Sequence, residues 1–159
     1  MKISLINLKQ AHFSLFYRWW NDPVLRKLTS EIKGKISNNK VDKILGEHLA
    51  SENGNDFIIT VDQKPVGHIL IQKKKRKKHF EVYIAIGEKD FWGKGVGTEA
   101  MKKACRWFFK NRPKENALEL EVLVNNPRAI RSYDKAGFKR VRIIHNKKNT
   151  DTVLMRKER

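Results

Sequence analysis

The chain has 159 residues, 40% of them hydrophobic and 9% aromatic, which suits one globular core and is short for two. Its 35 Lys and Arg against 17 Asp and Glu give a formal charge of +18, whereas small soluble domains usually carry a magnitude of about 2–8. No run approaches the roughly 18 apolar residues of a membrane span, and the N-terminus alternates apolar with polar residues, unlike a secretory leader. We therefore expect no membrane association and a cytoplasmic location.

The first fifty residues predict a strand and a helical hairpin. A short strand over 2–8 precedes a helix that should end at 21–23, because proline disfavours continued helix. A second helix is expected over 40–50, with Ser37 or Asn38 as its cap. The first helix carries the aromatic residues Phe13, Phe16, Trp19 and Trp20.

Strand patterns dominate the next segment. Three β-branched and aromatic runs, at 57–61, 66–72 and 81–86, are joined by a DQKP turn and by the basic run KKKRKK at 73–78. The simplest interpretation of Lys73 to Lys78 is a solvated hairpin tip that discourages edge pairing, and the alternative is contact with RNA, the ribosome or another polyanion. Aromatic residues do not alternate with these lysines, so no stacking platform for single-stranded nucleic acid is predicted.

Three glycines at alternate positions, Gly93, Gly95 and Gly97, separate the strand at 81–86 from a helical pattern. Glycines let backbone N–H groups turn inward and approach an anion, and a helix N-terminus adds its dipole. A cofactor with a pyrophosphate is the first expectation, and a plain strand-to-helix connection is the alternative. The single cysteine, Cys105, falls among apolar positions of this helix, so we expect a packing thiol and no disulfide or metal site.

Two other phosphate-binding patterns fit less well. Residues 95–100 match G-x-G-x-x-A, with Glu119 or Glu121 about 20 residues on, as a dinucleotide fold requires. A hairpin-rich half precedes this turn, however, whereas a dinucleotide fold begins with alternating strands and helices. No lysine followed by Ser or Thr comes after the glycines, which excludes a Walker-type loop.

The end of the chain predicts a strand at 118–124, a helix at 127–136 and two strands around an NKKNTD turn. This order favours an α+β fold with a mixed sheet, in a single domain over 1–159. The helix has Asn126 as a suitable N-cap and Gly137 as a suitable residue past its end. Tyr133 falls on its apolar face, where it is an ordinary core tyrosine or a functional one.

These two segments together resemble the GNAT superfamily of acetyl-CoA-dependent N-acetyltransferases. The family's pyrophosphate pattern, Arg/Gln-x-x-Gly-x-Gly/Ala, matches 92–97, with Trp92 in the Arg/Gln position. The second pattern, Asn-x-x-Ala-x-x-x-Tyr-x-x-x-Gly-Phe, matches 126–138. The segments RWWNDPVLRKLTS and TDTVLMRKE look like the RimJ/RimL-like branch, so the resemblance covers nearly the whole chain.

The resemblance implies a single-domain α+β fold. Six or seven mostly antiparallel strands would form a twisted sheet, splayed at its centre between 81–86 and 118–124 and flanked by about four helices. Acetyl-CoA would lie in the opening, with Asn126 on its pantetheine arm. The remaining implied cofactor-binding residues are Ile84 and Ile86 on the strand edge, and Trp92, Gly93, Lys94, Gly95, Val96, Gly97, Thr98, Arg128 and Arg131 near the phosphates.

The resemblance also assigns catalytic roles. The acceptor amine would attack the thioester directly, a backbone N–H near Ile84 to Ile86 would steady the oxyanion, and Tyr133 would protonate the departing thiolate. Glu81 is the candidate base, and its alternative role is a cross-strand partner for the adjacent lysines. Further candidates are His68 and His79 as bases and, less strongly, Asp22 and Asp151 at the acceptor site.

The sequence therefore predicts an acetyl-CoA-dependent N-acetyltransferase. Its acceptor is left open among a protein N-terminus or ribosomal protein, an aminoglycoside or other antibiotic, a polyamine, and a nucleotide-linked amino sugar. The basic charge slightly favours acceptors attached to anions. The rival from another class is a non-catalytic RNA- or ribosome-binding protein on the same scaffold, and a nucleotide-dependent oxidoreductase is a weaker alternative. The resemblance also allows a homodimer.

Overall fold

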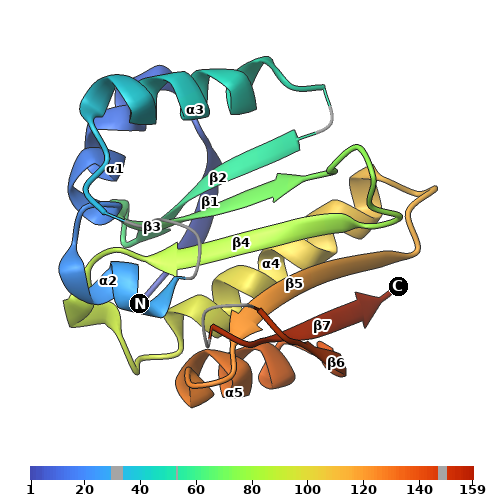
Figure 1. Ribbon diagram of the computed structural model, residues 1–159. Helices are drawn as coiled ribbons and strands as arrows, with labels where there is room; N and C mark the ends of the chain where they lie inside the picture. Colours follow the sequence, from blue (N-terminus) through green and yellow to red (C-terminus); the bar gives the residue numbers. More distant parts are fainter. Residues whose placement is uncertain (30–33, 53, 147–149) are drawn as a thin grey trace.

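A seven-stranded sheet forms the centre of the computed structural model, which describes residues 1–29, 34–52, 54–146 and 150–159. The strand order is β1-β2-β3-β4-β5-β7-β6, and only β4 and β5 run parallel (Figure 1). The strands are β1 Ile3–Asn7, β2 Gly54–Val61, β3 Lys64–Gln72, β4 Phe80–Ile86, β5 Ala117–Leu123, β6 Lys139–Ile144 and β7 Thr152–Glu158.

Helices cover both faces of the sheet and bury a separate apolar cluster on each. Helices α1 to α3 contribute to one cluster with Ile58 and Leu70, and α4 and α5 contribute to the other (Figure 1). The α-helices of the described residues are α1 Phe13–Trp19, α2 Pro23–Leu28, α3 Asn38–Ala50, α4 Val96–Asn111 and α5 Pro127–Lys135. The α+β fold with a sheet splayed at its centre is confirmed.

Helix α2 is the element that the sequence analysis missed. The first helix does end before Pro23, but this proline then occupies the first position of a new helix, where its missing N–H costs nothing. Asp22 caps it, because its Oδ1 accepts hydrogen bonds from the backbone N–H groups of Val24, at 2.8 Å, and Leu25, at 3.1 Å. Helix α2 supplies one wall of the cavity described below.

The splay in the sheet lies between β4 and β5. These strands pair at only two positions, Phe80 opposite Leu118 and Glu81 opposite Glu119. Beyond Glu81 they diverge, so the backbone edge of β4 from Val82 to Ile86 has no strand partner on that side within the described residues. Backbone donors and acceptors must find partners, so this edge suits an extended ligand that carries amide groups.

Strand β4 presents different side chains to the two faces. Ile84 and Ile86 pack against the α4 side, whereas Tyr83 and Ala85 face α1 to α3. Gly87 follows the strand, and a Cβ there would lie 2.2 Å from the Trp19 ring, so glycine allows α1 to pack against this end of β4.

Other local predictions hold. Ser37 caps α3 by accepting a hydrogen bond from the backbone N–H of Lys40 at 3.2 Å. Cys105 is 2% exposed, and burial raises the pKa of its thiol to about 12, as expected for a packing residue. The centre of the predicted NKKNTD turn, 147–149, lies outside the described residues. No helix in the described part of the chain is long and apolar enough to cross a membrane.

Candidate active site

A cavity of about 630 Å³ occupies the opening between β4 and β5 and continues toward α2 and α3. Both predicted catalytic residues, Glu81 and Tyr133, line it. One predicted cofactor-binding residue does not: Lys94 has its Nζ 5.9 Å from the centre of the Phe91 ring. The other predicted cofactor-binding residues all line the cavity, namely Ile84, Ile86, Trp92, Gly93, Gly95, Val96, Gly97, Thr98, Asn126, Arg128 and Arg131.

The glycine turn lines one side of the cavity and has a geometry that suits an anion. Gly93 and Gly95 have φ of 74° and 78°, the left-handed region in which glycine is favoured, and Gly95 is the N-cap residue of α4. The backbone N–H groups of the first turn, at Val96, Gly97 and Thr98, have no partner within the helix. They lie at the positive end of the helix dipole, so they can donate hydrogen bonds to a phosphate.

Trp92, which departs from the Arg/Gln of the family pattern, links the turn to its surroundings. Its indole Nε1–H donates a hydrogen bond to the carbonyl oxygen of Ile86 at 2.8 Å, which attaches the glycine turn to the end of β4. The guanidinium carbon of Arg128 lies 4.3 Å from the centre of the indole ring, an arrangement that favours a cation–π contact. Trp92 therefore also holds a positive charge beside the glycine turn.

Helix α5 forms the opposite wall. Asn126 is 8% exposed, and its Oδ1 accepts a hydrogen bond from the N–H of Ala129 at 3.2 Å, as expected of an N-cap. Its amide NH₂ makes no hydrogen bond within the described residues and can donate to a ligand. Ser132, which the sequence analysis missed, has its Oγ 2.8 Å from Oγ1 of Thr98 and joins α5 to α4. No sequence pattern marks this serine.

Tyr133 of α5 is half-buried and lines the cavity. Burial raises the pKa of its hydroxyl to about 12, so the group stays protonated near neutral pH. Within the described residues this hydroxyl makes no hydrogen bond, while its ring packs edge-on to Phe138 at 6.3 Å between centres. An O–H that lines the cavity without a partner can donate to a ligand that develops negative charge beside it.

Glu81 lies where β4 and β5 begin to diverge, and it is 4% exposed. Its carboxylate contacts Lys74 Nζ at 2.9 Å and Lys77 Nζ at 3.3 Å, and it accepts a hydrogen bond from the Tyr83 hydroxyl at 2.8 Å. Burial alone would raise the pKa of Glu81, but the hydrogen bonds from Lys74 and Tyr83 and both lysine charges outweigh burial and lower it. Glu81 is thus ionised and paired with the adjacent lysines, and its catalytic role remains a prediction.

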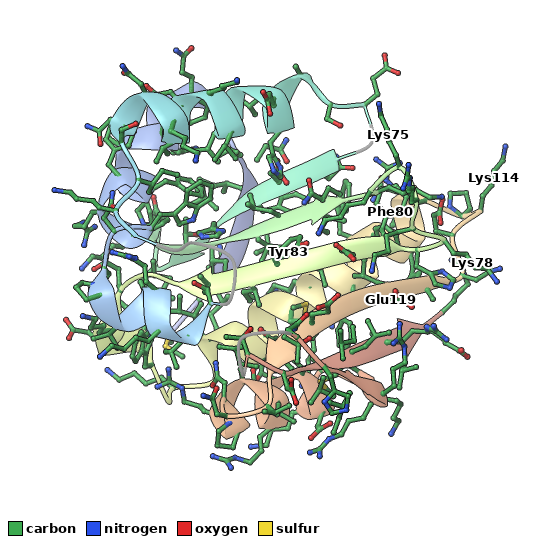
Figure 2. The ribbon with its side chains drawn as sticks, viewed as in Figure 1. Lys75, Lys78, Phe80, Tyr83, Lys114 and Glu119 are labelled. Carbon is green, nitrogen blue, oxygen red and sulfur yellow. The ribbon has the colours of Figure 1, made fainter. Side chains whose placement is uncertain are left out.

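Two further carboxylates, Glu119 and Glu121, lie on β5, the strand beside Glu81 of β4. Glu119 accepts hydrogen bonds from Arg156, whose Nε lies at 2.8 Å and Nη2 at 2.7 Å from Oε1. Glu121 accepts a hydrogen bond from the hydroxyl of Thr152 at 3.0 Å and lies 3.9 Å from Nζ of Lys77. Figure 2 shows Tyr83 and Glu119 near the centre of the sheet, on adjacent strands.

The basic run is divided between inward and outward lysines. Lys73 pairs with Glu115 at 3.3 Å, and Lys74 and Lys77 pair with Glu81 as above. Lys75 and Lys78 are exposed and point away from the sheet at its outer end (Figure 2). Lys74 and Lys77 therefore balance the negative charge of the buried Glu81 carboxylate.

The other candidate acids and bases are poorly placed for proton transfer. His68 accepts a hydrogen bond at Nε2 from the Trp20 indole at 3.2 Å, and burial, with the nearby charge of His48, lowers its pKa to about 3. A histidine with that pKa is too weak a base near neutral pH. The remaining three candidates do not line the cavity: His79, Asp22, which pairs with Lys89 at 2.7 Å, and Asp151, which pairs with His145 at 2.8 Å.

Within the described residues, no group of three or more His, Cys, Asp or Glu side chains is placed to hold a metal ion. The site instead combines a free strand edge, a helix N-terminus and the Tyr133 hydroxyl in one cavity. This combination suits an extended anionic ligand.

Comparisons with known proteins identify the family to which the chain belongs. A family model of the acetyltransferase (GNAT) domain matches residues 2–139, so the chain belongs to the GNAT acetyltransferase family. The curated relatives include an aminoglycoside N(6′)-acetyltransferase type 1 from Klebsiella pneumoniae, 24% identical in an alignment 144 positions long that covers 77% of this chain. The aligned region spans only 62% of that relative's length.

Solved structures show the same fold. AAC(6′)-Ib in complex with ribostamycin and coenzyme A superposes with a TM-score of 0.87 at 19% identity, covering 100% of this chain and 94% of that one. A spermidine N-acetyltransferase SpeG chimera, from Vibrio cholerae and hSSAT, superposes with a TM-score of 0.82 at 16% identity, covering 99% of this chain and 96% of that one.

Proposed function

We propose that the chain is an acetyl-CoA-dependent N-acetyltransferase that acts on a primary amine in a ternary complex. The observation that carries this proposal is the opening between β4 and β5, where an unpaired strand edge, the glycine turn and Tyr133 line one cavity. Family membership and the fold shared with a coenzyme A complex support it.

The residues present fit acetyl-CoA. The first-turn N–H groups of α4 suit its pyrophosphate, with Arg128 and Arg131 adding positive charge nearby. The edge of β4 near Ile84 and Ile86 suits the amides of its pantetheine arm, and the free NH₂ of Asn126 supplies a further donor. When bound, acetyl-CoA supplies an activated acetyl group as a thioester.

The chain's own residues then assist one substitution at the thioester carbon. The neutral amine forms a C–N bond, the C–S bond breaks, the amine loses a proton and the sulfur gains one. A free alkylamine has a pKa near 10, so a proton must first leave its ammonium form. We propose that the ionised Glu81 attracts that ammonium, that the ammonium proton leaves to water, and that Tyr133 donates its hydroxyl proton toward the departing sulfur.

The narrower predictions from the sequence are part of this proposal. Resemblance to the RimJ/RimL-like branch rests on the sequence FWGKG at 91–95 and on the segments near the two ends of the chain, whereas the relatives found include aminoglycoside acetyltransferases. Cytoplasmic location and a homodimer also remain predictions.

The test has two stages. Acetyl-CoA or CoA at 100 times its Kd should stabilise the fold by about 2.7 kcal/mol, which raises Tm by several degrees in a domain of this size. NAD serves as the control nucleotide and should leave Tm unchanged. CoA release should then depend on added amine. Saturating acetyl-CoA without any rise in Tm would contradict the proposal.

The RNA-binding rival has weaker structural support, because Lys73, Lys74 and Lys77 already pair with carboxylates of this chain. The outward residues Lys75, Arg76 and Lys78 are the ones to neutralise in its test. Salt-dependent RNA binding lost on neutralisation, together with no turnover of any amine, would favour the rival.

A further inference from the structure

The part of the cavity beyond β4, toward α2 and α3, has an apolar wall. Trp20 lies at the end of α1, Leu28 belongs to α2 and Ile44 to α3, and all three are half-buried. Leu70 of β3, only 6% exposed, completes this surface. A ligand that fills this region gains by burying hydrocarbon.

Among the residues that the structure describes, the carboxylates that line this cavity are few and already paired. Among the lining residues that the structure describes, the acidic ones are Glu81 and Glu121, against four Lys or Arg. Both carboxylates have partners within the chain: Glu81 is bound by two lysines, and Glu121 lies near Lys77 and accepts from Thr152. A ligand with several ammonium groups needs several uncommitted carboxylates, because each buried charge must be paired.

Arg26 adds a positive charge to the apolar part of the cavity, beside α2. It belongs to α2, lines the cavity and has its Nε buried without a hydrogen-bond partner in the described chain. A second ammonium on a bound amine would meet this guanidinium, and like charges in a partly buried site repel each other.

We infer that the acceptor is a monoamine on an apolar body, aromatic or branched aliphatic, with no second positive charge. The body packs against Trp20, Leu28 and Ile44, and its single amine reaches the thioester near Glu81. The amine nitrogen bonds to the acetyl carbon, sulfur leaves, and the proton lost by nitrogen balances the one gained by sulfur. This inference rests on the proposed function, and it separates the chain from proteins named for aminoglycosides or spermidine.

The experiment measures CoA release by the whole chain with a panel of amines at fixed pH. Phenethylamine, tryptamine and isopentylamine represent apolar monoamines, and spermidine and kanamycin represent polycations. We expect kcat/KM at least tenfold higher for the best monoamine than for either polycation. A polycation that matches or exceeds the best monoamine would overturn the inference.

Two variants test Arg26 itself. Arg26→Glu should raise the ratio of kcat/KM for spermidine to that for phenethylamine at least tenfold, and Arg26→Gln should raise it less. Lys43→Glu is the matched control, because Lys43 is exposed on α3, does not line the cavity and undergoes the same charge reversal. The control should keep the wild-type ratio. An unchanged ratio in folded Arg26→Glu or Arg26→Gln would contradict the role of this residue.

The outcomes also separate the two levels of the proposal. Acetyl-CoA that raises Tm while no apolar monoamine releases CoA would overturn the acceptor assignment and leave the cofactor assignment standing. Acetyl-CoA that fails to raise Tm would overturn the proposed function itself.

Discussion

Replacing Gly95 with alanine tests whether the glycine turn binds the cofactor's phosphates. Gly95 has φ of 78° and open space around the position of a Cβ, so the substitution causes backbone strain without a steric clash. An L-residue in this region costs roughly 1–2 kcal/mol, which lowers Tm by about 2–4 °C per kcal/mol in a domain of this size. If the backbone relaxes, the N–H groups of Val96 to Thr98 no longer point toward the phosphates. One charge-assisted hydrogen bond is worth about 1.5–3 kcal/mol, so the Kd for CoA should rise about 10- to 100-fold.

Gly34→Ala is the matched control. Gly34 has φ of 80°, also has open space around its Cβ position, and does not line the cavity. Both variants should lose similar stability in thermal unfolding, but only Gly95→Ala should weaken CoA binding in isothermal titration. If both variants bind CoA with the wild-type Kd, the phosphates do not depend on this turn and the reasoning is refuted.

Three further predictions concern individual side chains. Tyr133→Phe should lower kcat about 100-fold or more, as for loss of a general acid, with the Kd for CoA unchanged, and an unchanged kcat in steady-state assays would exclude the role. Glu81 has a lowered pKa when folded, so its ionised form adds stability above the unfolded pKa of about 4.3 that is lost as pH falls through the folded value. In urea unfolding, wild type should therefore be more stable than Glu81→Gln at pH 7, and this difference should shrink as the pH falls below about 4.3; a difference that does not change with pH would argue against the ion pairs. Cys105, with its pKa raised to about 12, should react with a thiol reagent at pH 8 only after unfolding, and fast labelling of the native chain would contradict its burial.

Local signals in the sequence were strong enough to predict most of the fold. Alternating β-branched residues, the caps Ser37 and Asn126 and the glycines near both helices act over a few residues, and the structure places them as expected. Helix α2 was missed because proline both ends and begins helices, and only the capping geometry of Asp22 distinguishes the two roles.

The candidate site was only partly predictable, for a physical reason. The proposed cofactor side consists of backbone N–H groups and short motifs, which a sequence displays directly. The proposed acceptor side brings together Arg26, Ile44 and Leu70 from distant elements, and their meeting depends on tertiary packing. The pairing of Glu81 with Lys74 and Lys77 is local by comparison, and the sequence analysis named it as the alternative role of Glu81.

The most direct test of the account is a crystal structure of the chain with acetyl-CoA bound. We predict pyrophosphate oxygens within about 2.7–3.2 Å of backbone nitrogens at Val96 to Thr98, and the thioester sulfur in hydrogen-bonding reach of the Tyr133 hydroxyl. The pantetheine amides should pair with the free edge of β4 between Val82 and Ile86. Acetyl-CoA bound elsewhere on the chain, with the opening between β4 and β5 filled only by solvent, would contradict the account.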